Sequence, residues 1–183
     1  MSSCVDHYLK CDGLQKMLME AGVISSRVMH GTRGREVQIP NALDMSQCCP
    51  EEYEKVKASA IEYGVVDFSK KNEDGKHGVR RDLTDEEIEE LKYWPIVFHN
   101  ENEVEWICKW KCNDDPAFFI SKLFPDKTFE YIMFYEGETD GIFTIKDGVF
   151  TPTDEWEEML KQIRAEKEAG QTAEPIDEDT LPF

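Results

Sequence analysis

The chain has 183 residues, which suits one domain with an appendage or two very small domains, and its 40% hydrophobic content is enough for a packed core. No stretch approaches the roughly 20 apolar residues that a membrane-spanning helix needs. The opening MSSCVDHYLKCDG lacks the apolar segment of a signal peptide. We therefore expect a cytoplasmic protein that does not associate with membranes.

The formal net charge of −18 restricts the classes of partner. Residues 1–49 hold equal numbers of acidic and basic side chains, so the whole excess lies from Pro50 onward. Such a surface repels phosphate backbones and disfavours direct nucleic-acid binding. It suits a basic protein, or a protein whose nucleic-acid-binding groove it could occupy. A surface that only confers solubility is the simpler interpretation.

In the first half of the chain, the apolar spacing predicts short strands and amphipathic helices. The strands are expected over residues 5–10 and 36–39, and the helices over 13–21 and 50–63. Pro50 suits the first turn of the second helix, because that position needs no backbone N–H.

In the second half, residues 69–82 are polar with two glycines, which predicts a loop. Thr84 and Glu87 have the spacing of a capping box that opens a helix, and Pro95 is expected to stop this helix. The remaining pattern predicts strands over 96–99, 104–110, 128–135 and 142–145, helices over 116–124 and 153–168, and a tail over 169–183.

The segment from Trp106 to Gly148 combines several features in a fixed order. They are a strand that reaches Trp110, a helix led by Pro116 and closed by Phe124-Pro125, an aromatic strand from Phe129 to Tyr135, then Glu136-Gly137, Gly141 and Gly148. In order and spacing, this segment resembles the YubB-type ferredoxin-like domain. That family consists largely of uncharacterised proteins from phages, conjugative plasmids and other mobile elements.

The resemblance implies a fold and an origin, and it implies no activity because none is established across the family. The expected fold is α+β, with a ferredoxin-like antiparallel sheet, helices on one face and a helical C-terminal extension. We predict one α+β domain over residues 1–152, with 96–150 as its ferredoxin-like half, a C-terminal helix over 153–168 and an acidic tail over 169–183. The expected location is then the bacterial cytoplasm.

The cysteines and histidines give no clear metal or catalytic motif. Cys4, His7 and Cys11 could supply three soft ligands, with Cys48 or Cys49 as a fourth, but the chain has no Cys-x2-Cys pair. Buried thiols are the simpler interpretation, so no metal or cofactor is predicted. None of the four histidines belongs to a nucleophile motif, and no catalytic residue is predicted.

Two groups of residues are candidates for binding. The loop His30–Arg35 (HGTRGR) could hold a small anion, since its glycines permit close backbone approach and Arg33 and Arg35 could bind a phosphate. A solvated loop is the simpler interpretation. The second group consists of aromatic residues with one adjacent acid, which would form a binding patch if exposed, although a core position is favoured: Trp106, Trp110, Tyr131 and Glu136.

These observations favour a non-enzymatic interaction protein whose partner is a basic or nucleic-acid-binding protein. A sharper version is an acidic inhibitor or DNA mimic that acts on a host protein. The alternative is a small-molecule or nucleotide-binding protein that uses the His30–Arg35 loop. A homo-oligomer formed through a sheet edge also stays open.

Overall fold

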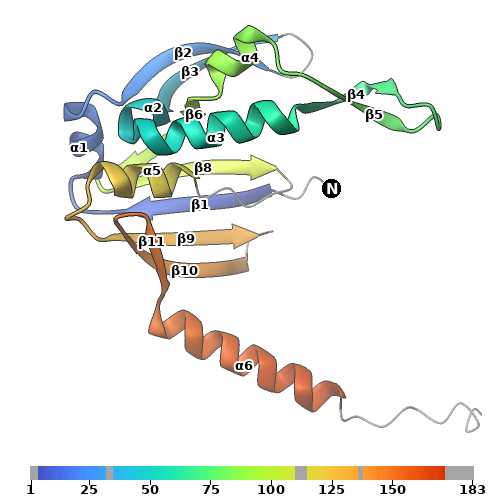
Figure 1. Ribbon diagram of the computed structural model, residues 1–183. Coiled ribbons are helices and arrows are strands. Elements are labelled where there is room, and N and C mark those ends of the chain that lie inside the picture. Colours follow the sequence, from blue (N-terminus) through green and yellow to red (C-terminus); the bar gives the residue numbers. More distant parts are fainter. Residues whose placement is uncertain (1–3, 32–34, 110–114, 136–137, 172–183) are drawn as a thin grey trace, which may run out of the picture.

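The computed structural model describes residues 4–31, 35–109, 115–135 and 138–171, and its largest feature is a six-stranded antiparallel sheet (Figure 1). The strand order is β11-β10-β9-β1-β8-β7. The strands are β1 (Cys4–Lys10), β7 (Val97–Asn100), β8 (Glu103–Lys109), β9 (Phe129–Tyr135), β10 (Glu138–Lys146) and β11 (Val149–Pro152).

Strand β1 lies inside this sheet, and its side chains alternate between the two faces. It pairs antiparallel with β8 on one side and with β9 on the other. Val5, His7 and Leu9 are buried on one face, while Asp6 and Tyr8 are half-buried on the opposite face. This period of two is the one expected of a strand, and the predicted strand over 5–10 is confirmed.

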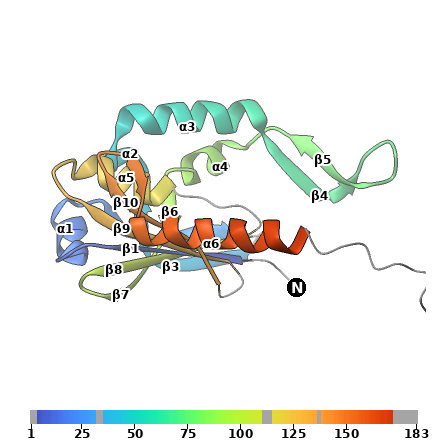
Figure 2. The same cartoon turned by 90° about the horizontal axis from the view of Figure 1, so that it is seen from below.

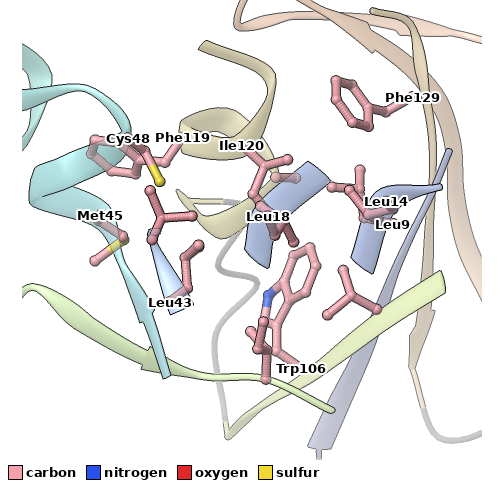
Figure 3. Close-up of a cluster of buried hydrophobic side chains, with 14 of the residues drawn as sticks. Leu9, Leu14, Leu18, Leu43, Met45, Cys48, Trp106, Phe119, Ile120 and Phe129 are labelled. Atoms are coloured by element: carbon pink, nitrogen blue, oxygen red, sulfur yellow. The ribbon is translucent and has the colours of Figure 1, made fainter. Parts of the chain in front are cut away.

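Helices α1 (Leu14–Glu20) and α5 (Asp115–Leu123) supply the core that packs on the sheet. Leu14 and Leu18 of α1 and Phe119 and Ile120 of α5 are fully buried in one cluster. Figure 3 shows these side chains converging with Trp106 of β8. The helices predicted over residues 13–21 and 116–124 are therefore confirmed.

A second, three-stranded sheet has the order β2-β3-β6. It leads through α2 (Met45–Cys48) into α3 (Pro50–Tyr63). Leu43 of β3 and Met45 of α2 belong to the same buried cluster as the residues of α1 and α5, so the core is continuous between the two sheets. The strands are β2 (Ile24–Gly31), β3 (Arg35–Asp44) and β6 (Tyr93–Pro95).

Strands β4 (Val65–Lys71) and β5 (His77–Arg81) form a hairpin that projects from the rest of the molecule in both views (Figures 1 and 2). The prediction of a loop over residues 69–82 is therefore wrong. Most side chains of the hairpin are exposed or half-buried, so its strands need no apolar alternation. Backbone pairing forms the hairpin, and a polar sequence does not reveal it.

Helix α4 (Asp85–Glu90) begins with the predicted capping box and ends earlier than predicted. The Thr84 hydroxyl accepts a hydrogen bond from the Glu87 amide, and the Glu87 carboxylate accepts one from the Thr84 amide. Tyr93 to Pro95 belong to β6 instead of the helix. A residue before proline avoids the helical region, and aromatic residues favour strands, which explains the early end.

The C-terminal helix α6 (Asp154–Gln171) extends away from the sheet beyond β10 (Figure 1). Its buried Trp156 lies near the start, where the helix contacts β10. The side chains that follow are mostly exposed. In the described part of the chain, no helix has both the length and the apolar character required to cross a membrane.

The predicted ferredoxin-like sheet with helices on one face is wrong. The observed architecture has a six-stranded sheet and two smaller sheets, β2-β3-β6 and β4-β5. The helices form no single layer over the large sheet (Figures 1 and 2). Helix α6 extends past the edge formed by β10 and β11, and α1 lies at one end of the strands. The error arose because only residues 106–148 resembled the family. The chain between β1 and β7 builds the two smaller sheets, and β1 joins the large sheet between β8 and β9.

Candidate binding groove

An apolar groove of about 550 Å³ lies where the six-stranded sheet, the three-stranded sheet and α4 meet. This volume falls in the range of sites that take small ligands or a few side chains. Its lining comes from segments far apart in the sequence: Met29 of β2, Leu83, Glu87, Glu90 and Leu91 in and around α4, Tyr93, Trp94 and Pro95 of β6, Val97 of β7, and Glu105, Trp106 and Ile107 of β8.

The apolar side of the groove includes exposed as well as buried side chains. Val97 and Ile107 are 56% and 58% exposed, although both are large hydrophobic residues. They lie on β7 and β8, and Val97 is paired with Glu105, two residues before Ile107. The groove therefore continues into an apolar surface patch, a feature that often marks a binding site.

Trp106 contributes to the groove from a buried, stacked position in the core. It is 1% exposed and stacks on His7 at 5.3 Å and on Tyr131 at 5.9 Å between ring centroids. The Tyr131 hydroxyl and His7 Nδ1 share a buried hydrogen bond of 2.6 Å. This stack orients the indole and leaves only a small part of its surface for contact.

All charged side chains in the described lining are glutamates. Glu87 accepts a bidentate pair of hydrogen bonds from Arg81, at 2.6 and 2.7 Å. The Arg81 guanidinium, together with the Thr84 amide, lowers the pKa of Glu87 to about 2. The bidentate ion pair therefore fixes the Glu87 carboxylate and compensates much of its charge.

Glu105 belongs to a small polar cluster on the sheet face that lies opposite the core. Its carboxylate contacts His99 Nε2 at 2.5 Å and accepts a hydrogen bond from the Tyr8 hydroxyl at 3.2 Å. Burial and the nearby Glu105 raise the pKa of Tyr8. These contacts hold the Glu105 carboxylate at the groove margin.

Among the predicted binding residues that the structure describes with their side chains, Trp106 lines this groove and Tyr131 does not. Trp106 and Tyr131 are both core residues. Trp110, Glu136 and Arg33 lie outside the described residues, and the position of the Arg35 side chain is not described. His30 and Gly31 at the end of β2 pair with Glu36 and Arg35 at the start of β3, and the residues between them are not described. The nucleotide-binding alternative stays a prediction.

The metal hypothesis gains no support from the described residues. Among them, no three His, Cys, Asp or Glu side chains are placed to hold a metal ion. His7 is inside the core stack, and Cys11 and Cys48 are free thiols. Burial raises the pKa of the Cys48 thiol to about 12, which makes it a poor ligand and nucleophile.

Comparisons with known proteins do not identify the chain. No protein-family model, curated protein or solved structure matches it. The resemblance of residues 106–148 to the YubB-type domain therefore stays a prediction.

Most of the groove could not be predicted from the sequence, because the residues that line the groove meet only in the tertiary structure. Glu105 and Ile107 alternate with Val104 and Trp106, so the sequence could have placed both on the outer face of a strand. Nothing in the local pattern indicated that β6 and α4 lie beside that strand.

Proposed function

We propose that this chain is a non-enzymatic interaction protein that binds a basic protein partner in the bacterial cytoplasm. The observation that carries the proposal is the groove. Its lining is mainly apolar, and its described charged residues are Glu87, Glu90 and Glu105. Such a surface complements a segment that combines apolar side chains with lysine or arginine.

The distribution of charge on the helices supports the same proposal. Several described lysines lie within 4 Å of a glutamate three residues away, which partly compensates their charge: Lys55–Glu52 and Lys57–Glu54 on α3, Lys161–Glu158 on α6, and Lys92–Glu89 just after α4. A negative field comes from the exposed carboxylates described on α4 and α6, which are Asp85, Glu86, Asp154, Glu155 and Glu157. This field attracts basic partners and repels nucleic acid.

A sharper version of the proposal is that the partner is a nucleic-acid-binding host protein. The acidic surface would then occupy the site of the phosphate backbone, as an inhibitor or DNA mimic does. An origin in a phage, plasmid or integrated mobile element would agree with this role. The resemblance of residues 106–148 supports that origin.

The test starts with capture of partners from bacterial lysate by the immobilised chain at low and at moderate salt. The captured protein is then purified and titrated against wild type, Glu90→Lys and the matched control Glu62→Lys. Glu62 is an exposed glutamate near the end of α3 and does not line the groove. Duplex DNA is added as a competitor in a parallel titration.

We expect one basic partner whose affinity falls steeply with salt and drops about tenfold in Glu90→Lys but not in Glu62→Lys. Competition by duplex DNA would support the sharper version. Binding that does not depend on salt, or a partner that is not basic, would contradict the proposal.

A further inference from the structure

The groove lies at a place where the large sheet is incomplete on one side. Strand β8 pairs with β7 only as far as Glu105, and the stretch from Trp106 to Lys109 has no described strand on that side. Strand β6, the last strand of the three-stranded sheet, and the residues in and around α4 supply most of the remaining lining. The groove is therefore a space that the fold itself leaves between two sheets and a helix.

The lining of the groove is mainly apolar, and part of it belongs to the core. Trp94 is half-buried and packs against the core cluster, and Trp106 is a member of that cluster. Val97 and Ile107, by contrast, are more than half exposed. Side chains that packing already orders lose little conformational entropy when a ligand binds, and covering the two exposed side chains removes apolar surface from water. Binding of an apolar molecule is therefore favoured.

The carboxylates of the lining already have partners. Glu87 forms the bidentate ion pair with Arg81. Glu105 contacts His99 Nε2 at 2.5 Å, and Glu90 is not without a partner either. A cationic ligand would have to compete with these contacts, an anionic ligand would be repelled, and burial of either charge beside apolar side chains costs desolvation free energy. The groove is therefore best suited to an uncharged molecule.

The size of the groove indicates the class of ligand. Its volume of about 550 Å³ lies within the range of about 300–1,000 Å³ that is typical of sites for a single small molecule. Trp94 adds an aromatic side chain to the lining, and aromatic rings pack favourably on one another.

We propose that the groove is a binding site for a small, uncharged and mainly apolar molecule with a flat ring, which would lie against Trp94, Val97 and Ile107. The inference goes beyond the proposed function and does not depend on it. Because the partner of the proposed function uses the same groove, the small molecule would compete with that partner.

The test uses the uncharged fluorescent probe N-phenylnaphthylamine, whose emission rises in an apolar site. Two charged relatives with the same ring system are the controls: anilinonaphthalene sulfonate, and a derivative of the probe that carries a trimethylammonium group. All three are titrated into the full chain at moderate salt, which screens the field of the net charge. Amide hydrogen exchange of the complex then locates the contact.

We expect the uncharged probe to bind at one saturable site per chain and to slow amide exchange in β6 and in the second half of β8. The sulfonate should bind about tenfold more weakly or worse, because it adds the cost of a buried anion beside carboxylates. The trimethylammonium derivative should bind no more tightly than the uncharged probe, because the carboxylates already have partners.

Substitutions at the two exposed apolar residues test the location without disturbing the core. Ile107→Arg and, as a second variant, Val97→Arg should each weaken binding of the uncharged probe about tenfold, because both place a cation and bulk in the groove. Val149→Arg is the matched control, since Val149 is 64% exposed on β11 at the opposite edge of the sheet. Its affinity for the probe should stay within about twofold of wild type.

Three results would overturn the inference. They are absence of saturable binding by the uncharged probe, tighter binding by the cationic probe or equal binding by the sulfonate, and unchanged affinity in both Ile107→Arg and Val97→Arg. If the probe does not bind but the captured basic partner loses affinity in Ile107→Arg, the groove belongs to the protein partner alone. The proposed function would then stand while the small-molecule site is excluded.

Discussion

Removal of the Tyr131 hydroxyl tests whether the stacked rings of His7, Trp106 and Tyr131 beneath the groove are shielded from water. The substitution Tyr131→Phe keeps the ring and its contacts with His7 and Trp106. It deletes only the oxygen that shares a hydrogen bond of 2.6 Å with His7 Nδ1. His7 is 0% exposed and Tyr131 is 1% exposed, so water cannot replace the lost partner without a local opening.

The expected cost follows from this burial. A buried polar atom that loses its hydrogen-bond partner costs about 1–3 kcal/mol, which is more than the net value of a typical hydrogen bond. Small proteins unfold in urea with a slope of about 1–3 kcal/mol per molar, so a loss of about 2 kcal/mol shifts the midpoint by roughly 1 M. Because the ring remains, no large cavity term is added.

The assay is urea unfolding followed by circular dichroism, with Tyr8→Phe as the matched control. Tyr8 is on the same strand as His7 but on the opposite, half-exposed face, and its hydroxyl donates to Glu105 at 3.2 Å. Its loss should cost less than about 0.5 kcal/mol. Equal midpoint shifts in the two variants would refute the argument from burial, as would a smaller shift in Tyr131→Phe.

The chain offers three further predictions. Because the folded pKa of Glu87 is about 2 and its usual value is 4.5, its contribution to stability is complete above pH 4.5 and is lost as the pH falls through 2. Glu87→Gln should therefore flatten the decrease in urea stability over this interval, and an unchanged pH profile would contradict this. Cys48, with its pKa of about 12, should resist iodoacetamide at about pH 8 until urea unfolds the protein, as peptide mapping by mass spectrometry would show. Early labelling would mean that the site opens. Gly64→Ala should cost more than Gly22→Ala in urea unfolding. Both glycines have positive φ, but a Cβ at Gly64 would lie 2.5 Å from a backbone oxygen, whereas one at Gly22 meets nothing within 4 Å. Backbone strain alone costs about 1–2 kcal/mol, and equal losses would contradict the clash at Gly64.

Apolar periodicity in the sequence predicted some of the elements that carry the core, but not the part of β3 that holds Leu43 or the short helix α2 that holds Met45. Leu14 and Leu18 marked the buried face of α1, and the alternation of Val104 and Trp106 marked that of β8. The capping box at Thr84 was predictable because it depends on two residues three apart. In each case the structural reason is local, so the sequence contains it.

The hairpin β4–β5 and the assembly of the sheets could not be predicted in the same way. Val66 is 43% exposed, so this hairpin has little buried surface to impose a pattern on its residues. The order β2-β3-β6 depends on Tyr93 to Pro95 pairing with residues some fifty positions earlier in the chain. The early end of α4 could have been predicted, because Tyr93 and Trp94 favour strands and lie just before a proline.

The properties of the groove are connected by the requirement that an exposed strand edge must not pair with itself. Val97 and Ile107 make the surface near the β7 and β8 edge apolar, which by itself favours association of identical chains. Glu90 and Glu105 place negative charge beside that surface, and two copies would bring these charges together. In the proposed function, the acidic residues of the groove also favour a complex with a basic partner. Under the proposed function, resistance to self-association and choice of partner depend on the same acidic residues, and one high net charge explains both.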